Sequence, residues 1–135
     1  MRTLFLAVFV LSLSACANDG PPMPVIPRQL AGSFGGNHVA LLLTARGGTL
    51  DFDCATGTIG PITPRGSHNY TAIGTFLPAP GGPSDSGLPP VRREVVFNGL
   101  VNVDSLSLTG KLSDGSVIGP FILIRNAPPT IYRCT

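Results

Sequence analysis

Apolar and polar positions alternate in short runs along this chain, and a period of two residues is typical of β-strands. The clearest run places Leu50, Phe52 and Cys54 on one face and Asp51 and Asp53 on the other. Because the apolar face of such a strand packs into the core, Cys54 is expected to point inward. An inward cysteine suits a buried disulfide.

Further runs of the same kind predict more strands, separated by turns rich in glycine and proline. In the run 67–77, Gly74 shares the inner face with Tyr70 and indicates a bend or a close approach of two backbones. A bulge is expected at Gly99. No run favours a helix. The other predicted strands are 37–44, 49–55, 57–62, 91–103, 104–112, 117–125 and 131–135.

Seven or eight strands joined by consecutive hairpins predict an up-and-down meander. Such a sheet has two exposed edges, and it removes both when it curls into a barrel. The sequence therefore predicts an all-β fold, a small antiparallel up-and-down β-barrel of seven to eight strands over residues 28–135. Segment 78–90 has no periodicity and is expected to be a long loop.

The composition supports short strands and excludes some partners. Charged residues make up 12% of the chain, whereas about 25% is usual, and there are 17 glycines and 14 prolines. The formal net charge is +2, without a basic cluster, which argues against nucleic acid as a partner. The chain has no tryptophan and two tyrosines, so it offers few aromatic platforms for sugars or single-stranded nucleic acid.

The N-terminus has the features of a secretory signal peptide. Arg2 supplies a positive charge, and an apolar run of about ten residues follows, too short for a transmembrane helix of roughly 20 residues. The run ends in Leu-Ser-Ala-Cys, which resembles the lipobox of bacterial lipoproteins. That resemblance implies that residues 1–15 are removed and that Cys16 receives a diacylglycerol and a further acyl chain. The alternative is an ordinary cleavage site near Ala17.

The resemblance to lipoproteins also implies a location in the cell envelope. Ala17 follows the modified cysteine, where an aspartate would signal retention in the inner membrane, so the outer membrane, facing the periplasm, is favoured. Residues 16–27 contain four prolines, which predict an extended tether between the lipid and the domain. Two or more acyl chains give stable anchoring to a membrane.

Cys54 and Cys134 remain after Cys16, and an even pair in an exported protein predicts one disulfide. It would close a loop of about 80 residues and stabilise the fold by at most about 4.5 kcal/mol in the chain-entropy model. Two free thiols or a pair of metal ligands are the alternatives. Neither cysteine has the close cysteine or histidine neighbour that metal sites use.

The domain is similar to a set of small uncharacterised bacterial β-barrel proteins. The resemblance covers residues 35–135 and consists of glycines and hydrophobic residues. It implies a small antiparallel barrel with paired cysteines and brings no activity. The segments that carry it are GGNHVALLLT, GGTLDFDCATGTI, YTAIGTF, LPAPGGP, FNGLV, LSLTGKL and IGPFILIR.

Candidate catalytic and metal-binding groups are few. His38 and His68 lie at the starts of predicted strands, and the Asp51 and Asp53 carboxylates share a face, which is typical of a solvated strand. His68 follows Ser67 without the strained turn of a nucleophile, and no glycine pattern of a dinucleotide site occurs. We therefore expect no enzyme activity, no metal and no cofactor.

The sequence predicts a membrane-anchored, non-enzymatic interaction module with a protein partner in the envelope. Loop 78–90 together with Arg92 and Arg93 is the expected contact surface, although charge at an edge strand also explains the arginines. Periplasmic inhibitors of lysozyme and of proteases offer an analogy of fold only. The alternative is a carrier of a small apolar ligand, as in lipocalins. Inward glycines would leave room for a ligand, but the short chain favours a filled core.

Overall fold

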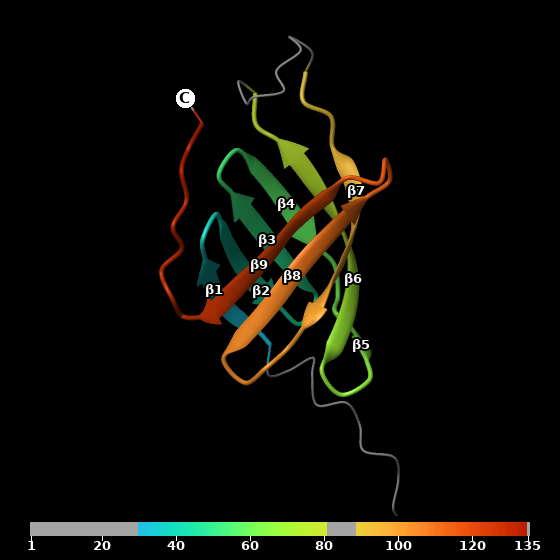
Figure 1. Cartoon of the computed structure of the whole chain (residues 1–135), viewed down its shortest axis with the longest axis vertical. Coiled ribbons are helices and arrows are strands. Elements are labelled where there is room, and N and C mark those ends of the chain that lie inside the picture. Colours follow the sequence, from blue (N-terminus) through green and yellow to red (C-terminus); the bar gives the residue numbers. More distant parts are fainter. Residues whose placement is uncertain (1–29, 81–88, 135) are drawn as a thin grey trace, which may run out of the picture.

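The computed structural model describes residues 30–80 and 89–134 (Figure 1). The predicted signal peptide 1–15, the lipid attachment residue Cys16 and the tether 16–27 lie outside the described residues. The described part of the chain contains no helix, and hence no helix long and apolar enough to cross a membrane.

The described residues form nine strands in one antiparallel sheet. Eight of them close into a barrel in the order β1-β2-β3-β4-β6-β7-β8-β9, with β9 returning to β1. The predicted all-β, up-and-down antiparallel barrel is thus confirmed. The strands are β1 (Gly32–Gly36), β2 (Val39–Thr44), β3 (Gly47–Phe52), β4 (Ala55–Ile59), β5 (Thr63–Arg65), β6 (Asn69–Pro78), β7 (Arg93–Leu100), β8 (Ser105–Leu112) and β9 (Val117–Arg125).

The short strand β5 is an addition to the barrel. The long strand β6 pairs with β5 through Asn69–Thr71 and with β4 through Gly74–Pro78. Strand β5 contains Pro64, which has no N–H to donate, and such a residue is tolerated on an edge strand. Strand β5 is therefore an edge strand paired with β6 and is not part of the closed barrel.

Large apolar side chains fill the interior. Positions alternate between buried and exposed along β2, β6, β7 and β8, as the two-residue period predicts. No charged or polar side chain is buried among the described residues. The buried apolar residues are Leu30, Phe34, Val39, Leu41, Leu43, Leu50, Phe52, Ala55, Ile59, Tyr70, Ala72, Val95, Phe97, Leu106, Leu108, Leu112 and Leu123.

The inward glycines make room for aromatic rings. A Cβ atom placed on Gly74 or on Gly110 would lie 2.9 Å from the ring of Phe97. A Cβ atom on Gly99 would lie 2.8 Å from the ring of Tyr70. A Cβ atom on Gly74 would also clash with the carbonyl oxygen of Thr58 in the neighbouring strand β4, so the predicted close approach of two backbones at Gly74 is observed. The space that these glycines leave is occupied by side chains, in agreement with the expectation of a filled core.

Tyr70 has a polar end inside this apolar core. Its hydroxyl donates a hydrogen bond to the carbonyl oxygen of Ser107 at 2.7 Å, and burial raises its pKa well above the usual value of 10. An unfolded chain ionises this tyrosine near pH 10, whereas the folded chain keeps it protonated. The folding stability that this group supports is therefore complete below pH 10 and is lost as the pH rises further.

The Tyr70→Phe variant tests this dependence. At neutral pH it should lose about 1 kcal/mol of unfolding free energy, because the Ser107 carbonyl loses its partner. Between pH 9 and pH 11, however, its stability should fall less than that of the wild type. Urea unfolding at several pH values measures both effects. A parallel decline in the two proteins would contradict the assignment to Tyr70.

Three local expectations are wrong. Cys54 lies with Asp53 in the turn between β3 and β4 and is partly exposed, because the chain reverses immediately after Phe52. The register of β6 and β7 continues through Gly99 without a bulge, and the irregularity falls between β8 and β9, near Gly110. Residues 131–134 form no strand, because their polar contacts are made with side chains instead of a sheet edge.

Candidate functional site

The chain beyond β9 forms what we call the C-terminal strap, residues 126–134. It turns back at Asn126, which has a φ of 57°, and runs along the outside of β1 (Figure 1). The Thr130 amide donates to the Gly36 carbonyl at 3.1 Å, and the His38 amide donates to the Thr130 carbonyl at 2.8 Å. A Cβ atom on Gly35 would lie 2.7 Å from the nitrogen of Pro129. The strap can lie this close because Gly35 has no side chain.

Two carboxylates at the end of β3 hold the strap. Asp53 accepts hydrogen bonds from the Tyr132 amide at 2.9 Å and from Nδ1 of His38 at 2.6 Å. The Arg133 guanidinium donates to both carboxylate oxygens of Asp51, at 3.2 and 2.9 Å. The two aspartates share a face, as predicted, and both remain partly exposed on that face while they bind the strap.

The predicted disulfide between Cys54 and Cys134 is confirmed, with 5.3 Å between the Cα atoms. It attaches the end of the strap to the turn between β3 and β4. The carbonyl of Cys54 also accepts a hydrogen bond from the Ala79 amide at 2.8 Å, so the same turn contacts the residue that follows β6. The contacts of Tyr132 and Arg133 were not predicted from the sequence. A usable signal was present, because Asp51 and Asp53 come just before Cys54 and Arg133 comes just before Cys134.

The Asp53→Asn variant should make the folding stability of the protein depend less on pH in acidic solution. The hydrogen bond from the Tyr132 amide, followed by the hydrogen bond and the charge of His38, lowers the pKa of Asp53 below 3.8. Its contribution to stability is therefore present above pH 3.8 and is lost as the pH falls through the lower folded-state value. Melting temperatures between pH 6 and pH 2 measure this loss. Asp104→Asn, at the opposite end of the barrel, is the control, and equal profiles for the two variants would contradict the prediction.

An open groove of about 510 Å³ lies on the outside of β4, β6 and β7. The Thr58 and Thr75 hydroxyls form a hydrogen bond of 2.8 Å within it, and the side chain of Ile73 is 63% exposed. The lining residues are Thr58, Ile59, Gly60, Ile73, Gly74, Thr75, Arg92, Arg93 and Glu94. Both arginines expected to form a contact surface thus lie on one groove. Residues 81–88 of the predicted loop lie outside the described residues.

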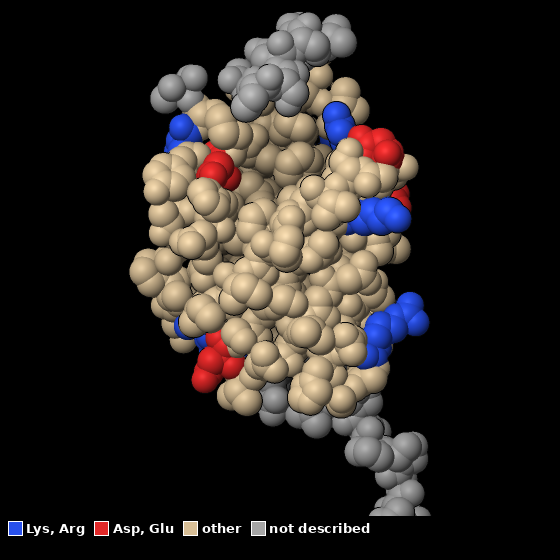
Figure 2. Space-filling view, in the orientation of Figure 1, with Lys and Arg blue, Asp and Glu red and all other residues tan. Residues whose placement is uncertain are grey.

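The two arginines differ in their partners. Arg93 forms an exposed ion pair with Asp114 at 3.1 Å. Hydrogen bonds from Ser116, and then the charge of Arg93, lower the pKa of Asp114. Arg92 makes no ion pair with any described residue, so its guanidinium is available to a ligand. Charged side chains are few and scattered over the face of the molecule shown in Figure 2. The groove combines one available cation, two hydroxyls and an exposed aliphatic side chain.

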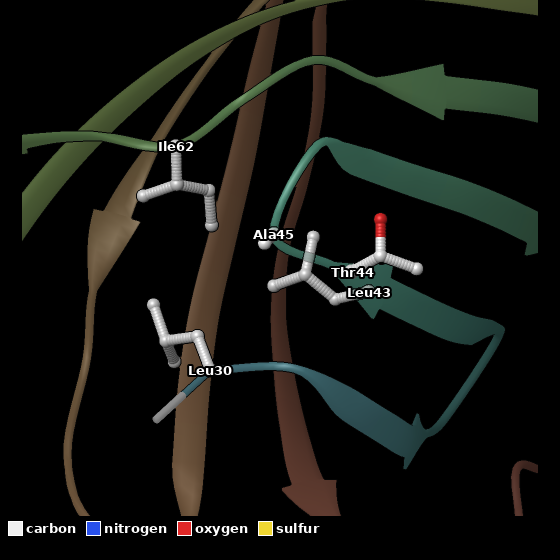
Figure 3. A pocket seen from close by; sticks show the side chains of 5 residues that line it. All are labelled: Leu30, Leu43, Thr44, Ala45 and Ile62. Atoms are coloured by element: carbon white, nitrogen blue, oxygen red, sulfur yellow. The ribbon is translucent and has the colours of Figure 1, made fainter. Parts of the chain in front are cut away.

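The end of the barrel where the described chain begins is closed by apolar side chains. Leu30, Leu43 and Ile62 point toward one another there (Figure 3). The cavity that they line together with Thr44 and Ala45 measures about 10 Å³, close to the space of one water molecule. This packing does not favour the carrier alternative, which requires a hollow interior.

The two histidines lie at opposite ends of the barrel. His38 is in the turn between β1 and β2, and His68 is in the turn between β5 and β6, with Nδ1 3.3 Å from the carbonyl oxygen of Val101. Among residues 30–80 and 89–134, no three histidine, cysteine or acidic side chains gather as metal ligands would. Comparison of the chain with family models, curated proteins and solved structures gave no match.

Proposed function

We propose that this protein is a lipid-anchored lipoprotein of the cell envelope, attached through Cys16, and that it acts as a non-enzymatic interaction module. The contact surface is the groove on β4, β6 and β7, with Arg92 at its rim. The observation that carries the proposal is the position of this groove outside a barrel whose described interior is filled by side chains. A barrel whose interior is filled by side chains binds partners through its outer surface.

The orientation of the barrel supports this role. The described chain enters at Leu30, beside the turn between β2 and β3, whereas Arg92 and Arg93 lie at the opposite end, where β7 begins (Figure 1). An extended, proline-rich tether of residues 16–27 would span roughly 37 Å at about 3.1 Å per residue. An anchor at Cys16 would therefore hold the arginine end of the barrel away from the membrane, toward partners in the periplasm.

The groove fits a protein partner that offers a carboxylate and an apolar side chain. Arg92 supplies a guanidinium without a described ion-pair partner, and arginine is enriched at the energetic centres of interfaces. Exposed Ile73 gives an apolar contact, and the Thr58 and Thr75 hydroxyls accept or donate hydrogen bonds. Glu94 is the only acidic residue among the described residues that line the groove, and it disfavours partners of uniform negative charge.

Intact mass of protein purified from membranes tests the anchor. The expected mass begins at Cys16 and includes acyl chains, and the Cys16→Ser variant should leave the membrane fraction. A soluble, unacylated wild type would contradict the proposal that the protein is lipid-anchored.

Photo-crosslinking in intact cells tests the contact surface. A photoreactive residue at Thr75 in the groove should give a protein adduct that one at Leu42, exposed on β2, does not give. Arg92→Glu should abolish the adduct, whereas Arg65→Glu, on β5, should leave it unchanged. An adduct that forms equally at both positions, or that persists in Arg92→Glu, would contradict the groove as the contact surface.

A further inference from the structure

The barrel closes between its first and last strands over a short ladder. The register of β1 and β9 has two residue pairs, Phe34 with Arg125 and Gly35 with Ile124. The register of β6 and β7 has eight. Local opening of a protein begins where few backbone hydrogen bonds and few buried contacts must be broken. We call the β1–β9 junction the closing seam, and it is where opening is expected to begin.

The C-terminal strap completes the hydrogen bonding of β1 at this seam. The Asn126 amide donates to the Ser33 carbonyl at 2.9 Å on one side of the two registered pairs. On the other side, the Thr130 amide donates to the Gly36 carbonyl of β1, and the Thr130 carbonyl accepts from the His38 amide in the turn after β1. Between these contacts the strap passes over Gly35, which is buried although it faces outward. The strap therefore covers the closing seam from outside.

The disulfide is the strongest attachment of the strap. The strap contributes no side chain to the buried core, which ends with Leu123. Its other distal attachments are exposed: the polar contacts of Tyr132 and Arg133 with the aspartates, and the Tyr132 ring 5.8 Å from the His38 ring. The side chain of Arg133 is 70% exposed. Exposed ion pairs stabilise weakly, because water screens them and two long side chains must be ordered. A covalent bond at Cys134 keeps the weaker contacts close enough to form.

Cys54 and Cys134 are both partly exposed, and thiol–disulfide exchange needs such access for an attacking thiolate. We propose that the strap is a redox-controlled clamp on the closing seam, closed while Cys54 and Cys134 are joined and released by a dithiol reductant. The first thiolate of the reductant breaks the S–S bond and forms a mixed disulfide, which the second thiol resolves. Two electrons and two protons pass to the cysteines, which become thiols, and the reductant becomes a disulfide.

Release exposes a specific surface. It frees the Gly36 carbonyl and the His38 amide at the edge of β1, together with the carboxylates of Asp51 and Asp53. A free strand edge accepts an extended segment of another chain. The inference does not depend on the proposed function, because the groove on β4, β6 and β7 lies away from the closing seam.

Hydrogen exchange of the purified full chain, oxidised and after reduction with dithiothreitol, tests the clamp. Reduction should speed exchange of the His38, Asn126 and Thr130 amides by at least about tenfold, because local opening exposes them. Amides in the β6–β7 ladder, such as those of Ala72 and Phe97, should keep their rates. The Cys54→Ser/Cys134→Ser double variant should behave like the reduced protein.

Two outcomes would overturn the proposal. Unchanged exchange at His38 and Thr130 after reduction would mean that the disulfide does not control the seam. Equal acceleration in the β6–β7 ladder would mean that reduction unfolds the whole barrel. The Arg133→Ala variant with its disulfide intact is the control and should change exchange at Thr130 by less than about threefold, as expected for an exposed pair. A seam that opens in this oxidised variant would also contradict the disulfide as the clamp.

Discussion

Replacing Phe97 by alanine is expected to lower the free energy of unfolding by about 3–5 kcal/mol, the usual range for an aromatic side chain removed from a core. Phe97 is 0% exposed, and its ring occupies the space beside two inward glycines, Gly74 and Gly110. Neither glycine has a side chain that can move into the cavity left by the ring. The loss should therefore lie in the upper part of the range.

Urea unfolding measured by circular dichroism would give this loss. Val96→Ala is the matched control, because Val96 is the neighbour of Phe97 in β7 but points outward and is 41% exposed. The control should lose less than about 1 kcal/mol. Phe97→Leu should fall between the two. Equal losses at residues 96 and 97 would contradict the assignment of the inner and outer faces of β7.

Gly99→Ala is expected to destabilise the barrel by about 1–3 kcal/mol or more, as over-packing of a core does. The added Cβ atom would clash first with the carbonyl oxygen of Ser107 in β8, and it would also lie 2.8 Å from the Tyr70 ring. The Tyr70 hydroxyl donates to the carbonyl of that same serine. Relief of both clashes therefore requires movement of the β8 backbone at Ser107 and of the buried Tyr70 ring that is bonded to it.

A double-mutant cycle identifies the cause of that loss. Tyr70→Leu removes the ring that the new methyl group would meet, so Gly99→Ala should cost less in this background than in the wild type. Thermal unfolding of the four proteins gives the coupling free energy. A cost that is the same in both backgrounds would assign the clash to the backbone of β8 alone.

The candidate site was only partly predictable from sequence. Arg92 and Arg93 follow a long aperiodic segment, a local signal for a contact surface, and both lie on the same groove. The hydroxyls and the aliphatic residue that share the groove come from β4 and β6, and no local pattern links them to the arginines. Their proximity follows from the pairing of Thr58 with Thr75 and of Thr75 with Glu94 across three strands.

The strap shows where local pattern analysis fails. Residues 131–135 have the composition of a strand, and Cys54 continues the alternation of Leu50 and Phe52. Alternation reports which side chains share a face, but it does not report where the chain reverses or whether a sheet edge is available for pairing. The turn at Cys54 and the side-chain contacts of Tyr132 and Arg133 depend on partners about 80 residues away.

The sequence by itself determined the class of fold, the strand faces and the paired cysteines. These features follow from a period of two residues, from turn residues and from the number of cysteines. All three can be recognised without knowing which distant residues are in contact. Only the tertiary structure decided that β9 pairs with β1 and that aromatic rings occupy the space beside inward glycines. It also decided that the C-terminal strap covers the closing seam. Each of these depends on contacts between residues distant along the chain, which are selected by the packing of the whole barrel.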